Sequence, residues 1–571
     1  MPPPPSATPD PGWTRCDWWL GALLLVTVLA VYWPALHGGL LLDDVLYVTP
    51  VTLRSWHGLW RIWFAVGATA RDYYPLLHSV LWVEHCLWGD TVTGYHLASA
   101  LQHAGSALLV VAIVHRLQLP GAWLAGFLFA LHPVCVESVA WMAEQKNTLS
   151  TVCFLGSLFV YLRYDQERRL PVYFLALSLF VLALLSKQVT ATLPAALLVV
   201  FWWQRGRIGW KRDVWPLLPW MTLGVAAGLL CVWGEQKLGG AEGADFAWSP
   251  GQHILVAGRA IWFYFGKLVW PADLAFVYPR WMVDTAVGWQ WLFPLGLLPL
   301  VAGLVWLSRK NRAPLAAFLL FTGMLSPVMG FLNIHFFVFS YVADHFQYLP
   351  MLGLIVPASA GLSLAWQRLP VRSQRWAPVA AAGLLAVLGT LAWRQAGCYR
   401  DNETLSRATL AHNPDCWLAH NDLGHALMFN RPGQEDEAIR HFKAAIQLRP
   451  DYSIAHSNLG NSYALIPGRM SEAIAEYEIA LRFSPDYLPA HLNLGNALAS
   501  SGRKAEAIAQ WEIVLARDPD NITTLLNLGL ILGQIPERRH EARPLIERAL
   551  RLAPDDARAR RLLDRLNAAD R

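Results

Sequence analysis

Long apolar stretches alternate with short polar loops through residues 1–399. A helix needs about 20 apolar residues to cross the hydrocarbon of a membrane. The pattern therefore predicts about eleven transmembrane helices, several of them short or interrupted by proline. They are residues 18–36, 94–114, 121–139, 147–162, 170–186, 188–203, 214–234, 289–307, 314–332, 346–366 and 377–394.

The last third of the chain repeats itself instead. Units at 415–450, 451–485, 486–519 and 520–554 each have Leu-Gly in their first half, an Ala-rich second half and a final proline. Four units in one phase predict tetratricopeptide (TPR) repeats, each a pair of antiparallel helices. We expect an all-α protein with three parts: a disordered N-terminus (1–17), a multi-span helical membrane domain (18–398), and a TPR α-solenoid (399–571) that starts with a partial repeat (399–414) and ends with a capping helix (555–571).

Composition supports this division. Of the 571 residues, 55% are apolar and only 15% are charged, which excludes a single soluble enzyme. All 29 tryptophans except Trp417 and Trp511 precede residue 399. The net charge of +5 is small for this length and favours no nucleic-acid partner. The seven cysteines contain no CxxC, which argues against a zinc site.

Basic residues concentrate in alternate short loops. Because such residues favour the cytoplasmic side, we expect a cytoplasmic N-terminus and a TPR domain on the opposite face. That face is the periplasm if the membrane is a bacterial inner membrane, and the lumen if it is the endoplasmic reticulum. The loops concerned carry Arg116, Arg163, Arg168, Arg169, Arg205, Arg207, Lys211, Arg212, Arg309, Lys310, Arg312, Arg368, Arg372 and Arg375.

Two outer segments are long. The first, about 37–93, contains WHGLWRIWF, whose aromatic spacing suits a helix lying in the membrane interface. The second, about 235–288, contains ILVAGRAIWFYFGKLVWP. This stretch is either a twelfth span or a helix on the outer surface, and Arg259 and Lys267 within it favour the surface helix.

Two adjacent carboxylates, Asp43 and Asp44, follow the first span in an apolar setting. A carboxylate near the membrane is costly to desolvate and often marks function. The alternative is a polar turn that caps the next helix, for which one carboxylate suffices. A pair can divide the work, since one group can act as general base while the other orients the acceptor or holds a metal ion.

Several blocks resemble one family. The acid pair, FLFALHPVCVESVAWMAEQKNTLS (127–150), LLSKQ (184–188) and ADHFQYLP (343–350), followed by TPR repeats, are similar to transmembrane and TPR repeat-containing proteins. These are multi-span glycosyltransferases of the GT-C fold, related to protein O-mannosyltransferases. The resemblance implies transfer of a sugar from a polyprenyl-phosphate donor to a hydroxyl on the outer face, with Asp43 and Asp44 catalytic. Two motifs depart from the family: DRYLYLP is DHFQYLP here, and Arg-x-Asp is Gln-Lys-Asn.

A donor phosphate that leaves with negative charge needs cations around it. Lys146, Lys187 and His345 are the candidates, and Arg71 is a weaker one. We expect other outer-face polar residues to line the site, although each alone could equally be a snorkelling or helix-capping residue, and Glu137 could pair with Lys146. These residues are His132, Glu137, Asp344 and Tyr348.

Asparagines recur at equivalent positions of the repeats. Either they cap helices or face water, or they form a ladder that binds the backbone of an acceptor peptide. The candidates are Asn458, Asn493 and Asn527, which precede the Leu-Gly pairs, and Asn461 and Asn496, which follow them.

The leading hypothesis is a membrane glycosyltransferase that moves mannose or another hexose and recruits protein acceptors through its TPR array. A non-catalytic TPR scaffold for envelope assembly is the main alternative, and a transporter is a third. A transporter is disfavoured because charged residues are scarce within the spans. The residues leave the sugar, the acceptor and the involvement of a divalent cation open.

Overall fold

The computed structural model describes residues 13–65, 67, 69, 73–237, 239–431 and 433–569, and all its regular elements in these ranges are helical. The predicted all-α fold is confirmed. The chain divides into two compact units, Met1–Asn413 and Pro414–Arg571, which are the membrane unit and the repeat unit below.

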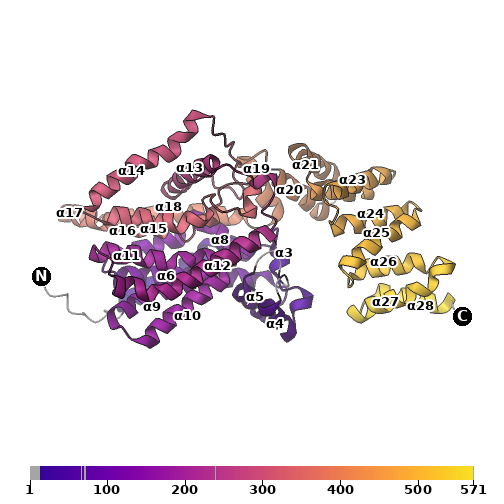
Figure 1. The fold of residues 1–571 in the computed structure, drawn as a ribbon, viewed down its shortest axis with the longest axis horizontal. Helices are drawn as coiled ribbons and strands as arrows, with labels where there is room; N and C mark the ends of the chain where they lie inside the picture. Colours follow the sequence, from indigo (N-terminus) through magenta and orange to yellow (C-terminus); the bar gives the residue numbers. More distant parts are fainter. Residues whose placement is uncertain are drawn as a thin grey trace. The chain divides into compact units, whose positions relative to one another are not determined.

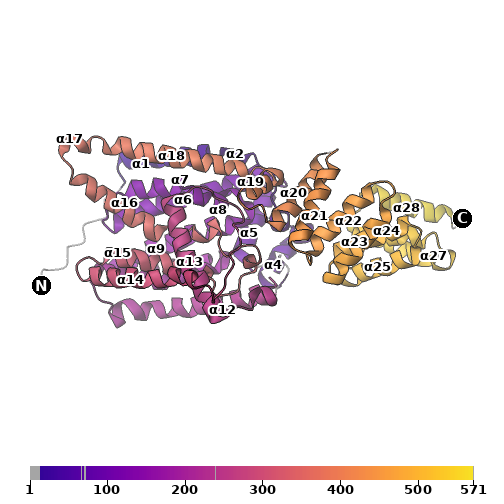
Figure 2. The same ribbon diagram turned by 90° about the horizontal axis from the view of Figure 1, so that it is seen from above.

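The membrane unit is a bundle in which α9 packs along both α6 and α10 (Figure 1 and Figure 2). Short helices α3 to α5 follow the first long helix. The helices are α1 (Arg15–Val31), α2 (Trp33–Leu36), α3 (Asp44–Tyr47), α4 (Trp56–Phe64), α5 (Pro75–Trp88), α6 (Val92–Arg116), α7 (Ala122–Leu131), α8 (Val136–Ala140), α9 (Gln145–Glu167), α10 (Leu170–Ser186), α11 (Leu193–Arg205), α12 (Leu218–Lys237), α13 (Pro250–Val269), α14 (Leu292–Ser308), α15 (Ala313–Leu325), α16 (Leu352–Gln367), α17 (Val371–Gln374), α18 (Ala377–Cys398) and α19 (Asn402–His412).

Several helices could cross a membrane. Within the described ranges, four segments have the necessary length and composition: Val92–Arg116, Trp210–Lys237, Gly288–Ser308 and Val371–Cys398. The pair Ala122–Leu131 and Pro133–Ala140, bent by 56°, is a fifth if it counts as one broken span. Shorter apolar helices include α10 and α16. The protein is thus a multi-pass membrane protein, while the eleven spans and the surface position of α13 stay predictions.

Both predicted ends of the membrane domain differ from the structure. Residues 1–12 of the predicted disordered N-terminus lie outside the described residues, but α1 begins at Arg15, because the side chains of Thr14 and Asp17 form a capping box there. At the other end, α19 belongs to the membrane unit rather than to the solenoid. The side chain of Asn402 accepts a hydrogen bond from the Leu42 N–H, and that of Asn413 donates to the Val277 carbonyl.

The repeat unit is a series of helix pairs, coloured orange to yellow in Figure 2. In each pair, the glycine of the Leu-Gly motif lets the second helix approach closely. A Cβ on Gly460 would lie 2.7 Å from the ring of Tyr477, and one on Gly424 would lie 2.8 Å from that of Phe442. The helices are α20 (Trp417–Asn430), α21 (Glu435–Leu448), α22 (Ser453–Leu465), α23 (Met470–Phe483), α24 (Leu488–Ser500), α25 (Lys504–Arg517), α26 (Ile522–Leu532), α27 (Arg539–Leu552) and α28 (Ala557–Ala569).

Candidate functional site

The site forms where the chain is not regular helix. After α7 the chain bends at Pro133, and after α8 it leaves helical geometry at Trp141, whose backbone is extended. A short 3₁₀ turn, Met142–Glu144, then leads into α9. The chain between α8 and α9 therefore offers peptide groups and side chains to its neighbours instead of to its own helix.

The acid pair divides into an exposed and a buried residue. The side chain of Asp43 is exposed, and no described residue donates a hydrogen bond to its carboxylate. Asp44 is fully buried, and its two oxygens accept hydrogen bonds from the N–H groups of Leu41 (2.8 Å) and Ala143 (2.7 Å). Asp44 thus ties the loop after α1 to the turn before α9.

The backbone before the acid pair is strained. Leu42 has a φ of 44°, in the left-handed region that is unfavourable for a leucine. The hydrogen bond from its N–H to the Asn402 side chain (3.0 Å) holds it there. Such strain persists only where surrounding contacts demand it, and here it turns the chain so that Asp43 faces outward while Asp44 faces inward.

Burial determines the charge state of Asp44. It raises the pKa of the carboxyl to about 7, although the N–H groups of Leu41 and Ala143 lower it, and the charges of Asp43 and Glu144 raise it further. A carboxyl with a pKa near 7 gains or loses its charge in the pH range in which most proteins function.

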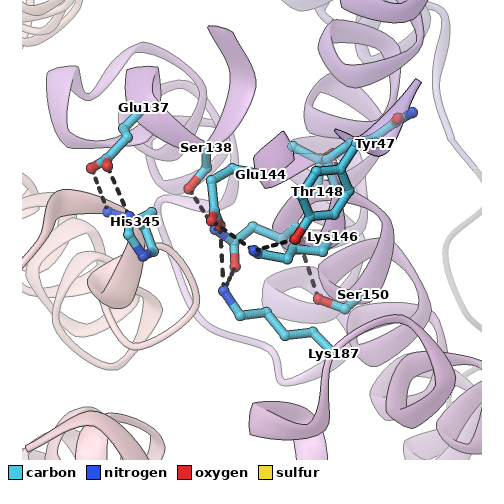
Figure 3. Close-up of polar contacts among 11 residues, drawn as sticks. Tyr47, Glu137, Ser138, Glu144, Lys146, Thr148, Ser150, Lys187 and His345 are labelled. Atoms are coloured by element: carbon cyan, nitrogen blue, oxygen red, sulfur yellow. Dashed lines mark hydrogen bonds and ion pairs between the residues drawn. The ribbon is translucent and has the colours of Figure 1, made fainter. Parts of the chain in front are cut away.

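Two predicted phosphate-binding residues meet on one carboxylate. The Nζ atom of Lys146 lies 3.0 Å from Oε1 of Glu144, and that of Lys187 lies 3.4 Å from Oε2 (Figure 3). Asn147 completes the group, because its Oδ1 accepts from Lys187 (2.6 Å) and its Nδ2 donates to Glu144 (2.6 Å). We call Glu144, Lys146, Asn147 and Lys187 the lysine cluster. It begins one residue after the N–H that holds Asp44.

The charges of the cluster keep Glu144 ionised. Burial pushes its pKa upward, but His345, Lys146 and Lys187 together lower the pKa to about 2. Lys146 also lies against Tyr47 of α3, with Nζ 3.5 Å from the hydroxyl and 5.4 Å from the ring centre. The one-turn helix α3 thus carries both Asp44 and a contact to the lysine cluster.

His345 lies in a different contact from the one expected. Its Nδ1 is 2.8 Å from Oε1 of Glu137, and its N–H donates to Oε2 of the same carboxylate, as Figure 3 shows to the left of the lysine cluster. The alternative pairing of Glu137 with Lys146 is wrong, because the turn after α8 brings Glu144 to the lysine instead. His345 still acts on Glu144 through its charge.

The other predicted lining residues make structural contacts. The Asp344 carboxylate accepts from the Tyr278 hydroxyl (2.9 Å), and the Tyr348 hydroxyl lies 2.7 Å from Nδ1 of His103. His132 bonds through Nε2 to the Leu268 carbonyl (3.0 Å). None of these three contacts reaches the lysine cluster. Arg71 lies outside the described residues.

Sequence reasoning missed Glu144, Asn147 and Tyr47. The string AEQKN (143–147) places an acid, two amides and a lysine in a row between two apolar stretches. Such a run of polar residues next to membrane spans indicates a polar site. It also missed a buried contact next to the cluster, in which the Gln145 side chain donates to Glu84 of α5 (2.7 Å). Within the described residues, no three His, Cys, Asp or Glu side chains are placed to hold a metal ion.

The asparagines of the repeats bond to one another across neighbouring repeats. Each Nδ2 donates to an Oδ1 of the preceding repeat: Asn458 to Asn421 (3.0 Å), Asn493 to Asn461 (2.9 Å) and Asn527 to Asn496 (2.7 Å). They form a ladder, but its rungs join repeats. All five predicted asparagines remain partly exposed, so the amides keep an outward side.

Comparison with known proteins matches both units. Residues 73–233 match the family model for dolichyl-phosphate-mannose-protein mannosyltransferase. Residues 426–466 and 490–533 match models of TPR repeats. The chain thus joins a segment similar to this mannosyltransferase family to TPR repeats. The stretch that matches the mannosyltransferase model contains the lysine cluster and begins after the acid pair.

Curated relatives carry names of the same kind. The chain is 25% identical over 401 residues to protein O-mannosyl-transferase F38B6.6 of Caenorhabditis elegans, covering 67% of this chain and 54% of the relative. It is 31% identical over 155 residues to protein O-mannosyl-transferase Tmtc1 of Drosophila melanogaster, covering 27% of this chain and 16% of the relative. The chain thus spans about half the length of the first and less of the second.

Among solved structures, a thermophilic TPR protein of Thermus thermophilus matches at 23% identity with a TM-score of 0.26. That match covers 34% of this chain and 97% of the other.

Proposed function

We propose that the protein transfers mannose, or another hexose, from a polyprenyl-phosphate donor to hydroxyl groups of protein acceptors on the non-cytoplasmic face. The observation that carries this proposal is the direct link between the acid pair and the lysine cluster, through the hydrogen bond from the Ala143 N–H to Asp44. The family model matched by residues 73–233 and the names of the relatives support the same reaction.

Asp43 is the general base in this proposal. Its carboxylate is exposed and can reach an acceptor hydroxyl, whereas Asp44 is buried and holds the loop in place. Asp43 takes the proton of the hydroxyl as its oxygen attacks C1 of the sugar, and the bond between C1 and the phosphate oxygen breaks. The polyprenyl phosphate leaves with the electron pair of that bond and gains one negative charge.

The lysine cluster binds that phosphate. Ammonium groups held near a developing negative charge stabilise it most when their positions are set beforehand. Glu144 and Asn147 set the position of Lys187, while Glu144 and Tyr47 set that of Lys146. No metal is required by these assignments, and none is part of the proposal.

The repeat unit recruits the acceptor. TPR repeats are protein-interaction modules whose stacked helices form an extended concave surface. In our proposal the partly exposed amides of the asparagine ladder bind the acceptor backbone, and the repeats lie in the periplasm or the lumen. Tethering then raises the local acceptor concentration to roughly the millimolar range.

The test uses the full-length protein in lipid vesicles with a polyprenyl-phosphate-mannose donor and a hydroxyl-bearing peptide, and mass spectrometry detects hexose addition. Asp43→Asn should lower transfer by a factor on the order of 10²–10⁴ while leaving the fold intact. The matched control is Asp90→Asn, which changes an aspartate that is 77% exposed and lies near Arg54 and His85 rather than in the acid pair. Normal transfer by Asp43→Asn would remove the catalytic assignment and favour a scaffold.

A further inference from the structure

Glu84 and Gln145 form a buried contact that the proposed reaction does not use. Glu84 lies on α5 and is 4% exposed, and Gln145 is the first residue of α9 and fully buried. Nε2 of Gln145 donates to Oε1 of Glu84 at 2.7 Å. The remaining oxygen of each side chain, Oε2 of Glu84 and Oε1 of Gln145, is buried without a hydrogen-bond partner.

Two orphaned oxygens in one contact need an explanation. Buried polar atoms are nearly always hydrogen-bonded, and an unpaired one costs about 1–3 kcal/mol. An ionised carboxylate has only acceptors and cannot satisfy an amide oxygen. A protonated carboxyl has an O–H group, which can donate to the amide oxygen while its other oxygen accepts from the amide N–H. One added proton would therefore satisfy both atoms.

We propose that Glu84 is a neutral carboxylic acid whose Oε2–H donates to Oε1 of Gln145, so that the two side chains close a ring of two hydrogen bonds between α5 and α9. Glu84 is then a positioning residue for the lysine cluster. Gln145 lies between Glu144 and Lys146 in the sequence, so the ring holds the first turn of α9 against α5. The catalytic consequence of this proposal rests on the proposed function, but the protonation state does not.

The surroundings of Glu84 favour the neutral form. Burial raises the pKa of Glu84 to about 8, and the hydrogen bond from Gln145 lowers it. The helices packed on α5 are α4, α6, α9 and α10, and no charged group from them shifts the pKa of Glu84. Among the described residues, Tyr95 of α6 is the titratable group whose pKa depends on the charge state of Glu84.

Substitutions separate this ring from an ionised Glu84. Glu84→Gln keeps one acceptor and replaces the O–H donor by an N–H donor, so the ring survives without a titratable group. We expect this variant to fold and to keep transfer within about twofold of the original. Glu84→Leu leaves the amide of Gln145 unpaired and should lower transfer about tenfold or more.

The exchange of both residues provides a second check. Gln145→Glu alone places two carboxyl groups together, whereas Glu84→Gln combined with Gln145→Glu rebuilds the ring in reverse. We expect the double variant to recover most of the transfer lost in the single one. If the double variant is as impaired as Gln145→Glu, the ring of hydrogen bonds does not position the first turn of α9.

The deciding experiment is infrared difference spectroscopy of the full-length protein in lipid vesicles. The original protein should show the carbonyl band of a protonated carboxyl at neutral pH, and the band should fade as the pH rises through about 8. Asp44, whose pKa is about 7, contributes to the same band, so Glu84→Gln should lose only the part that titrates near pH 8. Glu242→Gln, at a glutamate that is 55% exposed, should leave the whole band unchanged. A spectrum in which Glu84→Gln removes only an ionised-carboxylate band would overturn the proposal. This readout needs no transfer, so an inactive original protein would count against the proposed function alone.

Discussion

The two units use polar side chains inside their folds in opposite ways. In the membrane unit, the ionised carboxylate of Glu144 is buried and contacts Lys146 and Lys187, whose side chains are only 14% and 13% exposed. In the repeat unit, neutral amides such as Asn493 and Asn461 join neighbouring repeats and stay partly exposed. Buried charges cost several kcal/mol each to desolvate, whereas hydrogen-bonded amides cost little. In our proposal the membrane unit retains its charges for the transfer reaction, and the repeat unit uses its amides to join neighbouring repeats and to bind the acceptor.

The largest effect is expected when the buried carboxylate of the lysine cluster is removed. Glu144→Gln leaves Lys146 and Lys187 without their shared anion, so we expect the free energy of unfolding to fall by about 3–5 kcal/mol. Unfolding in mixed micelles measures this loss. Glu242→Gln is the control, because changing an exposed glutamate should shift the value by no more than about 0.5 kcal/mol. Equal stability of the two variants would contradict the electrostatic account of the cluster.

The buried carboxyl of Asp44 should make the stability of the membrane unit depend on pH. Its pKa is raised to about 7 in the folded protein, from an ordinary value near 3.8. The folded state therefore holds a proton that the unfolded chain has released, and this contribution is fully present below about pH 4 and lost as the pH rises through 7. The slope is about 1.4 kcal/mol per pH unit in that window.

Unfolding free energies measured from pH 4 to pH 8 check this expectation. Asp44→Asn should have a flatter profile than the original protein. Its free energy of unfolding should also be lower, because the new amide nitrogen cannot accept a hydrogen bond and would face the N–H of either Leu41 or Ala143. Asp43→Asn should keep the original slope, because that residue is exposed. Parallel profiles for all three proteins would show that Asp44 does not carry the effect.

The smallest effect is expected in the repeats. Asn493→Ala removes one hydrogen bond to Asn461 and should cost about 1 kcal/mol, with the change confined to the two repeats it joins. Hydrogen exchange of the full-length protein measures this locally. A double-mutant cycle with Asn461→Ala isolates the pair. Zero coupling, with acceptor binding lost, would mean that Asn493 serves the acceptor and not the stack.

Sequence patterns predicted the local features well. The repeat period placed the helix pairs of the repeat unit, and the scarcity of charge within apolar stretches drew attention to Lys146 and Lys187. The repeat period and the position of a charge within an apolar stretch both depend only on residues that are close together along the chain. The expected partial repeat at 399–414 differed from the structure because α19 is held by contacts with residues far away in the sequence, such as Leu42.

Contacts between distant elements were not predictable in the same way. Periodicity assigned residues 121–139 to one span without locating a bend, whereas the chain bends at Pro133 and leaves helical geometry at Trp141. Those two changes of direction decide that Glu137 meets His345 and that Glu144 meets the lysines. Likewise, equivalent asparagines were predicted to share a face, but spacing alone does not reveal that they bond to one another.

In our proposal the lysine cluster binds the donor phosphate, while Asp43 performs the proton transfer. The most direct measurement is the affinity of the full-length protein in lipid nanodiscs for a polyprenyl-phosphate-mannose donor, with transfer measured on the same samples. Lys187→Met and Lys146→Met should each weaken donor binding about tenfold or more, because each removes one charge-assisted contact to the phosphate. Asp43→Asn should bind the donor normally and fail to transfer. Normal donor binding in both lysine variants, with loss of binding in Asp43→Asn, would contradict the account.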